Sequence, residues 1–507
     1  MKAVWWIKRD IRISDNKCIS QADNGCVEIL PFFCWEPNIL NFNDFSSFHL
    51  QAQWQALAGL EKRLINLGAG MRVVSGEITK KLEELYRLYP FSHLYSHQET
   101  GNLISFARDK KVKAWCKYNR IEWIEYSQNS VVRGGNADTR RKGLVHSNFR
   151  GRPLVKVPSV FTNSMSKSFY KPLQNWSEIC KSFPKFSGCS NSKSLQRVDE
   201  KNGLETLHSF LTNRGKNYAG GISSPNTAFT YGSRLSSHLA WGTISLRTVF
   251  SELDSRRREL ANEEKITGWK RSLRSFESRL HWRDHFIQRL ESSPDMEDKV
   301  LNPAYDSLEY EDRNDLLEAW LKGSTGYPMV DACMRCLNET GFLNFRMRAM
   351  VVSFACFGLH LSWRLIHMPL AKLFLDYEPG IHLSQLQMQA GVIGFNAIRV
   401  YNPAKQFTDH DSNGEFVKRW VPELRDLKSV EILNIEKLNL PMYVNPIACL
   451  KSRSRVMKDR IFEIRRSEQG FSETKKILKK HGSLKSVRKK TTAKQTSQLE
   501  LAINFEV

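Results

Sequence analysis

Three glutamines in one short segment are the first residues whose type and spacing could serve chemistry. Gln385, Gln387 and Gln389 alternate with apolar residues in the stretch IHLSQLQMQAGVIGFN, residues 381–396. Side-chain amides both donate and accept hydrogen bonds, so an enclosed run of them could bind a polar ligand. A polar surface loop and an edge strand with a period of two residues fit the same pattern. The segment alone leaves all three interpretations open.

A pair of cysteines is the second candidate for chemistry. The ten cysteines are scattered, and Cys333 and Cys336 form a C-x-x-C motif. An iron–sulfur or zinc site would need two more thiolates, which Cys356 and Cys449 could supply. The apolar residues around the pair recur with the spacing of a helix face. We therefore interpret the pair as small buried residues and expect no metal site.

The overall composition favours a polyanionic partner. The 507 residues include 76 Lys and Arg against 53 Asp and Glu, which gives a net charge of +23. Such an excess is typical of proteins that bind nucleic acid. The start of the chain carries no secretory signal, and the longest apolar run, 349–361, is too short to cross a bilayer. With the scattered cysteines, these features predict a cytoplasmic protein with no membrane partner, and we expect a monomer.

The hydrophobic pattern divides the chain into an α/β part and a helical part. Strand patterns that alternate with helical stretches predict a parallel sheet with right-handed crossovers. The expected strands are 3–8, 27–35, 71–76, 92–97 and 121–127. Neither G-x-G-x-x-G nor a Walker A motif is present, so an ordinary dinucleotide or nucleoside triphosphate site is not indicated.

We expect four segments along the chain. Residues 1–130 form the α/β domain, 131–200 a basic interdomain linker, 201–465 an all-α domain and 466–507 a basic tail. The tail is rich in lysine between 475 and 494, so we expect it to be solvated, disordered beyond about residue 485 and able to contact phosphate.

Five motifs together resemble the photolyase/cryptochrome family, and this chain resembles a divergent, bacterial-type member. KRDIRISDN, at 8–16, is similar to the loop that follows the family's first strand. The other four follow in the family's order: YGSRLSSHLAWGTIS (231–245), RLHWRDHF (279–286), TGYPMVDACMRCLNETGFLNFRMR (325–348) and IRVYNPAKQFTDHDSNGEFVKRWVPELRDL (398–427). The resemblance implies an N-terminal antenna-type α/β domain with a parallel, Rossmann-like sheet, and an all-α C-terminal domain that binds FAD.

The resemblance also implies which residues hold the FAD. Hydroxyl groups and helix N-terminal N–H groups suit a pyrophosphate, and a cation near the flavin ring stabilises its reduced anion. The residues at the family's phosphate positions are Tyr218, Ser233, Arg234, Leu235 and Ser236. Those expected around the rest of the cofactor are Phe276, Arg283, Arg348, Asp376, Tyr377 and Glu378. A buried structural ion pair is the alternative explanation for Arg348 and Asp376.

The glutamine segment now has an expected place beside the flavin. The family has an asparagine near flavin N5 and then a Trp-x-Trp motif, and in this chain His382 falls near the asparagine, though a shift of one residue would give Leu383. Gln387 and Gln389 fall where the two tryptophans would be. We therefore expect both glutamines to face the flavin and substrate pocket, buried and hydrogen-bonded.

Other departures concern the substrate and the electron path. Trp282 is kept, whereas Arg279 replaces a glutamate that contacts the lesion, and Asn344 and Phe345 replace the His-Asn pair of a family motif. Trp320 and Trp363 match the middle and outer members of the family's tryptophan triad. The proximal member is missing, and Tyr377 or Tyr401 could take its place.

The resemblance implies a light-driven DNA photolyase. Such an enzyme transfers an electron from reduced FAD to a pyrimidine dimer, which is flipped into a pocket of UV-damaged DNA that the protein binds largely without sequence preference. A second antenna chromophore of the folate or deazaflavin type is also expected. The alternatives are a cryptochrome-like blue-light photoreceptor without repair activity and a nucleic-acid-binding protein with a structural flavin.

Overall fold

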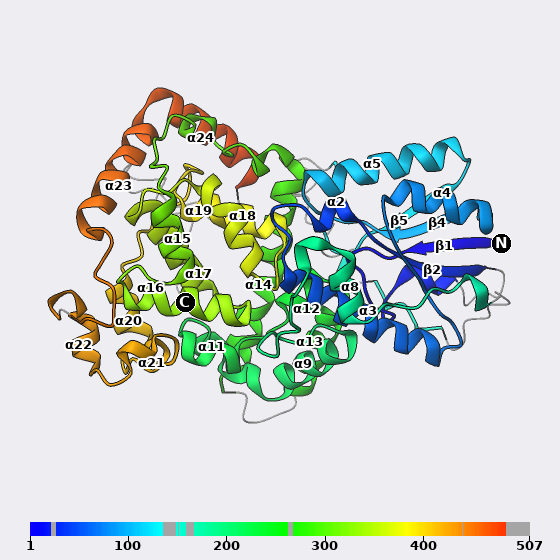
Figure 1. The fold of residues 1–507 in the computed structure, drawn as a ribbon, viewed down its shortest axis with the longest axis horizontal. Helices are drawn as coiled ribbons and strands as arrows, with labels where there is room; N and C mark the ends of the chain where they lie inside the picture. Colours follow the sequence, from blue (N-terminus) through cyan, green and yellow to red (C-terminus); the bar gives the residue numbers. More distant parts are fainter. Residues whose placement is uncertain are drawn as a thin grey trace.

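The chain folds into a parallel sheet followed by a helical array, which confirms the predicted fold class (Figure 1). The computed structural model describes residues 1–21, 27–134, 149–150, 152–158, 167–261, 267–438 and 440–482. All neighbouring strands of the sheet pair in parallel, in the order β3-β2-β1-β4-β5. The strands are β1 (Lys2–Trp6), β2 (Glu28–Trp35), β3 (Arg72–Ser75), β4 (His93–His97) and β5 (Glu122–Tyr126).

Helices cover both faces of the sheet, because successive side chains of its buried strands point to opposite sides. Trp5 packs on one face in a core that includes α3 (Ser47–Asn66). Its neighbour Trp6 packs on the other face with α4 (Ile78–Leu88) and α5 (Leu103–Tyr118). Both faces are therefore apolar, as the near-continuous hydrophobic strands require.

Part of the predicted linker packs against the α/β part. Residues 135–148, 151 and 159–166 lie outside the described residues. Farther along, α8 (Trp176–Ser182) places Ile179 in the same core as Trp5. This segment thus contributes to the α3 side of the sheet.

The C-terminal part is helical from α9 onward. Its site-forming helices are α10 (Tyr218–Gly221), α11 (Pro225–Tyr231), α12 (Ser236–Ala240), α14 (Trp269–Ser292), α17 (Phe345–Ser353), α18 (Trp363–Leu373) and α19 (Pro379–Gln389). The helices around them are α9 (Glu200–Thr212), α13 (Leu246–Ala261), α15 (Asn314–Lys322), α16 (Pro328–Thr340), α20 (Pro403–His410), α21 (Glu415–Trp420) and α22 (Ser429–Leu433). In the part of the chain that the structure describes, we find no helix whose length and apolar character would let it cross a membrane.

The loop after β1 joins the two parts of the molecule. Arg9 donates a hydrogen bond to the carbonyl oxygen of Tyr377 at 2.6 Å, and Arg12 donates to the carbonyl oxygen of Gly242 at 3.0 Å. Gly242 has a φ of 67°, and a Cβ atom there would lie 1.9 Å from the Arg9 carbonyl oxygen. Only glycine allows this approach, so the contact fixes the loop against the helices.

The predicted tail, 466–507, begins with an ordered helix that packs on the rest of the protein, so the expectation of a solvated segment is wrong up to residue 481. After α23 (Leu450–Arg466), α24 (Glu468–His481) packs on the residues that follow α14. Asn302 donates to the Thr474 hydroxyl at 3.1 Å, and buried His481 lies 3.1 Å from the Ser293 hydroxyl. Residues 483–507 lie outside the described residues.

Candidate functional site

One candidate site is a cavity of about 330 Å³ enclosed by α14, α17, α18 and α19, with α10, α11 and α12 at one end. Its volume falls in the range typical of small-molecule sites. Its lining is mostly apolar, with a few charged side chains that converge on it. Such a lining can hold a ring system and orient it by polar contacts.

An ion pair stands on the cavity wall. Arg348 of α17 donates from Nη2 to both carboxylate oxygens of Asp376, at 2.9 and 2.8 Å. The Arg348 guanidinium also lies 4.1 Å from the centre of the Phe374 ring. Burial opposes the charged form of Asp376, but Arg348, Ser236 and Arg234 hold its pKa below the ordinary value. The site therefore presents a fixed cation and a fixed anion to a ligand.

Arg234 is held with an unsatisfied nitrogen at the cavity. Its backbone lies in the left-handed region at φ 59°, a conformation that costs a non-glycine residue about 1–3 kcal/mol. Its guanidinium lies 3.7 Å from the centre of the Phe342 ring, and its buried Nη1 has no protein partner. Burial lowers the pKa of Arg234 to about 10, although Asp376 opposes the shift. The side chain remains a cation whose Nη1 lacks an acceptor.

Glu378 is a buried carboxyl group with one free oxygen. Its Oε2 lies 3.8 Å from Nη2 of Arg283, whereas its buried Oε1 has no protein partner. Burial raises the pKa of Glu378, although Arg9 and Arg283 oppose the shift. Glu378 can therefore donate or accept a hydrogen bond at the cavity.

The glutamine segment forms helix α19, so both the surface-loop and the edge-strand interpretations are wrong. One face of α19 packs on α14: a Cβ atom at Gly380 would lie 2.7 Å from Cα of Ile287, and Ser384 donates to the Phe286 carbonyl at 3.2 Å. The opposite face lines the cavity. Its lining residues follow the helical period: Ile381, His382, Gln385, Leu386, Met388 and Gln389.

Gln387 does not face the cavity, so that prediction is wrong. Its position on the helix turns the side chain toward the residues after α14, because 380, 384 and 387 share one face. Its Oε1 accepts from the Leu301 N–H at 2.7 Å, and its Nε2 donates to the carbonyls of Met296 and Lys299 at 2.9 and 3.0 Å. Gln387 is buried and hydrogen-bonded as expected, but it anchors a loop. Gln389 does line the cavity.

His382 and Tyr377 lie side by side at the cavity wall, with ring centres 5.4 Å apart. Nε2 of His382 lies 3.2 Å from the His367 carbonyl oxygen. Burial, together with His367, holds the pKa of His382 well below its ordinary range, so its imidazole is neutral. A neutral imidazole can donate or accept a hydrogen bond but carries no charge to the site.

The remaining predicted residues divide into two groups. The cavity brings together Tyr218, Ser233, Leu235, Ser236, Phe276, Trp282 and Arg283. Trp320 and Trp363 are buried in the helical core and do not line it. Residues that sequence reasoning placed only as neighbours, Gln385, Leu386 and Met388, do line it. A helical period applied to 378–389 would have identified them.

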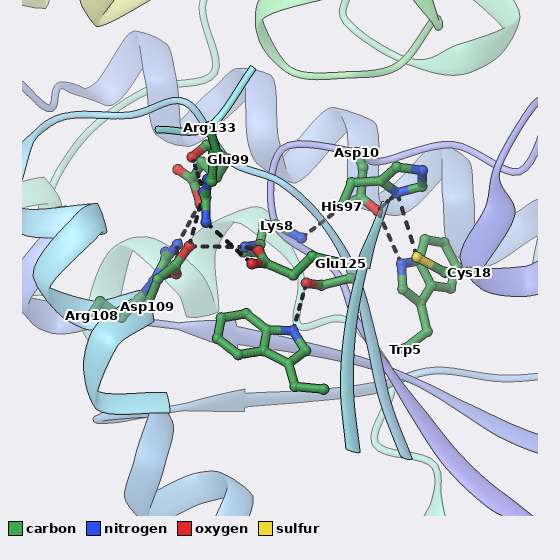
Figure 2. A network of polar contacts seen from close by, with 12 residues as sticks. Trp5, Lys8, Asp10, Cys18, His97, Glu99, Arg108, Asp109, Glu125 and Arg133 are labelled. Carbon is green, nitrogen blue, oxygen red and sulfur yellow. Dashed lines mark hydrogen bonds and ion pairs between the residues drawn. The ribbon is translucent and has the colours of Figure 1, made fainter. Parts of the chain in front are cut away.

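A polar network surrounds the carboxyl ends of the sheet strands (Figure 2). Arg108 pairs with Glu99 at 2.5 Å and with Asp109 at 2.8 Å, and Lys8 pairs with Asp109 at 3.2 Å. A cavity of about 80 Å³ lies beside this network, lined also by Tyr377. Burial raises the pKa of Glu36, another lining residue, to about 7, although Arg108 opposes the shift.

Asp10, Cys18 and His97 form a buried trio whose metal-binding atoms lie within 4.8 Å of one another. Nδ1 of His97 lies 2.8 Å from the Asp10 carboxylate and 3.5 Å from the Cys18 sulfur, and Trp5 donates to Asp10 at 3.1 Å. These mutual contacts satisfy the hydrogen-bonding groups of the three side chains, so we interpret the trio as a structural network.

The C-x-x-C pair lies within helix α16. Among the described residues, the trio above is the only group of three or more metal-ligating side chains, and it does not include Cys333 or Cys336. Both cysteines are fully buried in α16, as the helical pattern predicts.

The large cavity fits FAD by the chemistry of its unsatisfied groups. Four buried polar atoms at its wall have no protein partner: Nη1 of Arg234, Oε1 of Glu378, Oε1 of Gln385 and Oδ1 of Asn344. Buried polar groups are rarely left unpaired, so a ligand with both an anionic group and a polar ring edge would satisfy them. Arg234 would hold the pyrophosphate, and Arg348 with Asp376 would lie beside the flavin ring.

Comparisons with known proteins agree with this site. Residues 3–152 match a family model described as DNA photolyase, and residues 276–462 match the FAD binding domain of DNA photolyase. A chloroplastic/mitochondrial cryptochrome DASH from Solanum lycopersicum is 25% identical over 490 residues, covering 89% of this chain and 81% of that protein. A deoxyribodipyrimidine photo-lyase from Synechococcus is 24% identical over 455 residues, covering 86% and 92%. The crystal structure of an archaeal photolyase from Sulfolobus tokodaii with two FAD molecules superposes with a TM-score of 0.74 at 26% identity, covering 91% of this chain and 100% of that one. The two family models, the full-length relatives and the shared fold show that this chain belongs to the photolyase/cryptochrome family.

Proposed function

We propose that this protein is a light-driven, FAD-dependent DNA photolyase that repairs UV-induced pyrimidine dimers. One observation carries the proposal: a single cavity combines the Arg348–Asp376 pair with the unpaired Nη1 of Arg234 and Oε1 of Glu378. The relatives named deoxyribodipyrimidine photo-lyase support the same activity.

FAD bound in this cavity supplies the light-driven electron for dimer splitting. The protein positions and shields it. Arg348 would supply a cation to stabilise the reduced ring, and Glu378 would supply a hydrogen bond to it. Where the cavity meets solvent, Phe345 is 44% exposed and the Arg279 guanidinium lies 5.5 Å from its ring centre. We propose that this cation and ring receive the flipped dimer, because they can bind phosphate and stack on a base.

We further infer that the family's Trp-x-Trp positions fall on Leu386 and Met388. These two residues have the same spacing and both line the cavity, whereas Gln387 between them faces the loop. The ring that the family places nearest the flavin is then replaced by aliphatic side chains. Gln389 remains a candidate for hydrogen bonding to a base edge.

DNA binding should depend on salt, partly through helix α24. Four exposed lysines on this helix, Lys475, Lys476, Lys479 and Lys480, would neutralise phosphates. Each phosphate contact contributes about −0.9 to the slope of log K against log salt concentration. Replacing all four by glutamine should therefore flatten the slope by up to about 3.6. Fluorescence anisotropy with a duplex at several salt concentrations measures this change.

Helix α5 provides a control with the same change in net charge. Its exposed lysines are Lys110, Lys111, Lys113 and Lys117. Their replacement by glutamine should leave the slope nearly unchanged if the contact is local to α24. An equal effect of both sets would mean that overall charge, and not α24, determines affinity.

We also propose that the protein is monomeric and cytoplasmic, and that a second chromophore binds in the smaller cavity beside the sheet. The position of this cavity at the carboxyl ends of the strands supports the chromophore, since ligands of open α/β sheets bind at that edge. Glu99 matches the position where some relatives hold a folate only poorly, and it is already paired with Arg108. We propose a chromophore of the folate or deazaflavin type.

Light-dependent repair tests the proposed function directly. The FAD-loaded, chemically reduced protein is mixed with duplexes that carry one cyclobutane dimer or one 6-4 product, in blue light and in darkness. We expect restoration of intact bases for one of the two lesions, in light only. Failure to repair either lesion with fully reduced, flavin-loaded protein would reject the enzyme.

A photoreceptor is the second candidate, and a specific chain of contacts favours it. Gln387 on the cavity helix binds the Leu301 N–H, and the adjacent Asn302 binds Thr474 of α24. A change at the cavity therefore has a short path to the C-terminal helix. Light-induced protease sensitivity of α24, without repair, would identify this function.

A further inference from the structure

The cavity holds an aromatic side chain whose environment suits electron transfer. Tyr377 lies between Asp376 and Glu378 and lines the large cavity, whereas Trp320 and Trp363 do not. Its ring also borders the smaller cavity beside the sheet. Tyr377 is thus the nearer of these three rings to any ligand in the large cavity.

The Tyr377 hydroxyl has a proton acceptor in place. It donates to Oδ2 of Asp44 at 2.9 Å, and Asn102 donates to the same oxygen at 2.9 Å. Two donors on one oxygen stabilise the carboxylate form. This separation lies within the range in which a carboxylate can take a proton. Asp44 is 5% exposed, so water does not compete freely for this bond.

The surrounding groups hold Tyr377 and Asp44 in this arrangement. Arg9 donates to the Tyr377 carbonyl at 2.6 Å, and the His49 ring stacks on the Tyr377 ring with centres 5.6 Å apart. Burial raises the pKa of Asp44, although Tyr377, Arg9 and Asn102 oppose the shift. Glu297 and Lys185 are also coupled to Asp44: burial and the Asp44 charge raise the pKa of Glu297 to about 7, and burial lowers the pKa of Lys185 although Asp44 opposes that shift.

We propose that Tyr377 is the immediate electron donor when the bound flavin is photoreduced, with Asp44 as its proton acceptor. This inference rests on the proposed flavin site. The Tyr377 ring loses one electron to the photoexcited flavin, its O–H bond breaks, and the proton moves to Asp44 Oδ2. The products are a neutral tyrosyl radical and a neutral Asp44 carboxylic acid. An added thiolate then returns one electron and Asp44 returns the proton; the resulting thiyl radicals pair as a disulfide.

The test compares three variants loaded with FAD. Tyr377→Phe and Asp44→Asn keep the shape of the site but remove the hydroxyl and the base. Tyr401→Phe is the matched control, because Tyr401 lies outside the cavity lining. We expect photoreduction under blue light with a thiol to slow at least tenfold in the first two variants and to be unchanged in the third.

Two readouts do not depend on enzyme activity. A tyrosyl radical should be detected by electron paramagnetic resonance after a flash in the wild type and be absent in Tyr377→Phe. The equilibrium FAD affinity of Tyr377→Phe and of Asp44→Asn should stay within about twofold of the wild-type value. Unchanged photoreduction in Tyr377→Phe, or its loss in Trp282→Phe instead, would overturn the proposal. Repair by the chemically reduced wild-type protein is measured separately: its absence would indicate failure of the proposed function, whereas repair together with unchanged photoreduction in Tyr377→Phe would indicate failure of this donor alone.

Discussion

Asp376→Ala should yield a protein that binds FAD at least tenfold more weakly than the wild type. The substitution removes both acceptors of the bidentate contact at 2.8 and 2.9 Å and leaves the Arg348 cation without its charge partner, with only the Leu343 carbonyl oxygen still accepting from it. Breaking a buried ion pair by removing one partner costs about 3–5 kcal/mol, and Arg348, at 27% side-chain exposure, places this case toward the low end. Absorbance of bound flavin after gel filtration, with thermal unfolding of the same sample, measures both effects.

An exposed ion pair supplies the control. Arg364 and Asp306 lie 2.8 Å apart with side-chain exposures of 40% and 58%. Asp306→Ala should change stability by less than about 1 kcal/mol and leave flavin binding intact. If Asp376→Ala keeps full flavin occupancy, the pair is structural and does not serve the cofactor.

The fold class could be predicted because two hydrophobic periods alternate clearly along the chain. Strand β1 places apolar residues on both faces, as in Trp5 and Trp6, which is the pattern of a sheet buried on both sides. The helical half lacks that alternation. The types and spacing of residues along the chain were thus sufficient to predict the fold class, without knowledge of long-range contacts.

Cavity residues from α12, α14 and α17 could be predicted where they belong to continuous motifs. Ser233, Arg234 and Ser236 lie within one short motif and all line the cavity. The left-handed backbone of Arg234 and its stacking on Phe342 could not be predicted, since they depend on contacts between segments far apart in sequence.

The register of α19 could not be predicted reliably from the family's motif. The alternation of glutamines suggested a period of two residues, whereas the helix rotates by about 100° per residue and places 386 and 388 near the cavity. Moving from Leu386 or Met388 to Gln387 exchanges a cavity position for one that faces the loop after α14. Gln387 therefore lies within the motif region but does not face the cavity as the motif residues would.

The charge pattern likewise did not predict that α24 is an ordered, packed helix. Lysines at 475, 476, 479 and 480 suggested a solvated tail, yet Thr474 before them and His481 after them are buried. Gly470, Thr474, Ile477 and His481 follow the helical period and form the packed side of α24.

Gln387→Ala should destabilise the protein by about 3 kcal/mol or more, because it removes three hydrogen bonds from a fully buried amide. The Leu301 N–H and the carbonyls of Met296 and Lys299 would lose their partner, and each buried group left unpaired costs about 1–3 kcal/mol. Urea unfolding followed by circular dichroism measures the loss.

The same substitution should loosen α24, since Asn302 follows Leu301 and holds Thr474. Limited proteolysis should then cut near α24 faster than in the wild type. Gln389→Ala is the matched control: it removes the same side chain from the same helix, but from the cavity face, and should have a much smaller effect on both measurements. Equal destabilisation by the two substitutions would show that loss of helix packing, and not the anchored loop, dominates. Gln387→Trp would also place an indole against the 296–301 loop and should unfold the region. A stable Gln387→Trp protein with faster photoreduction would instead show that residue 387 occupies the motif position beside the flavin, contrary to the structure.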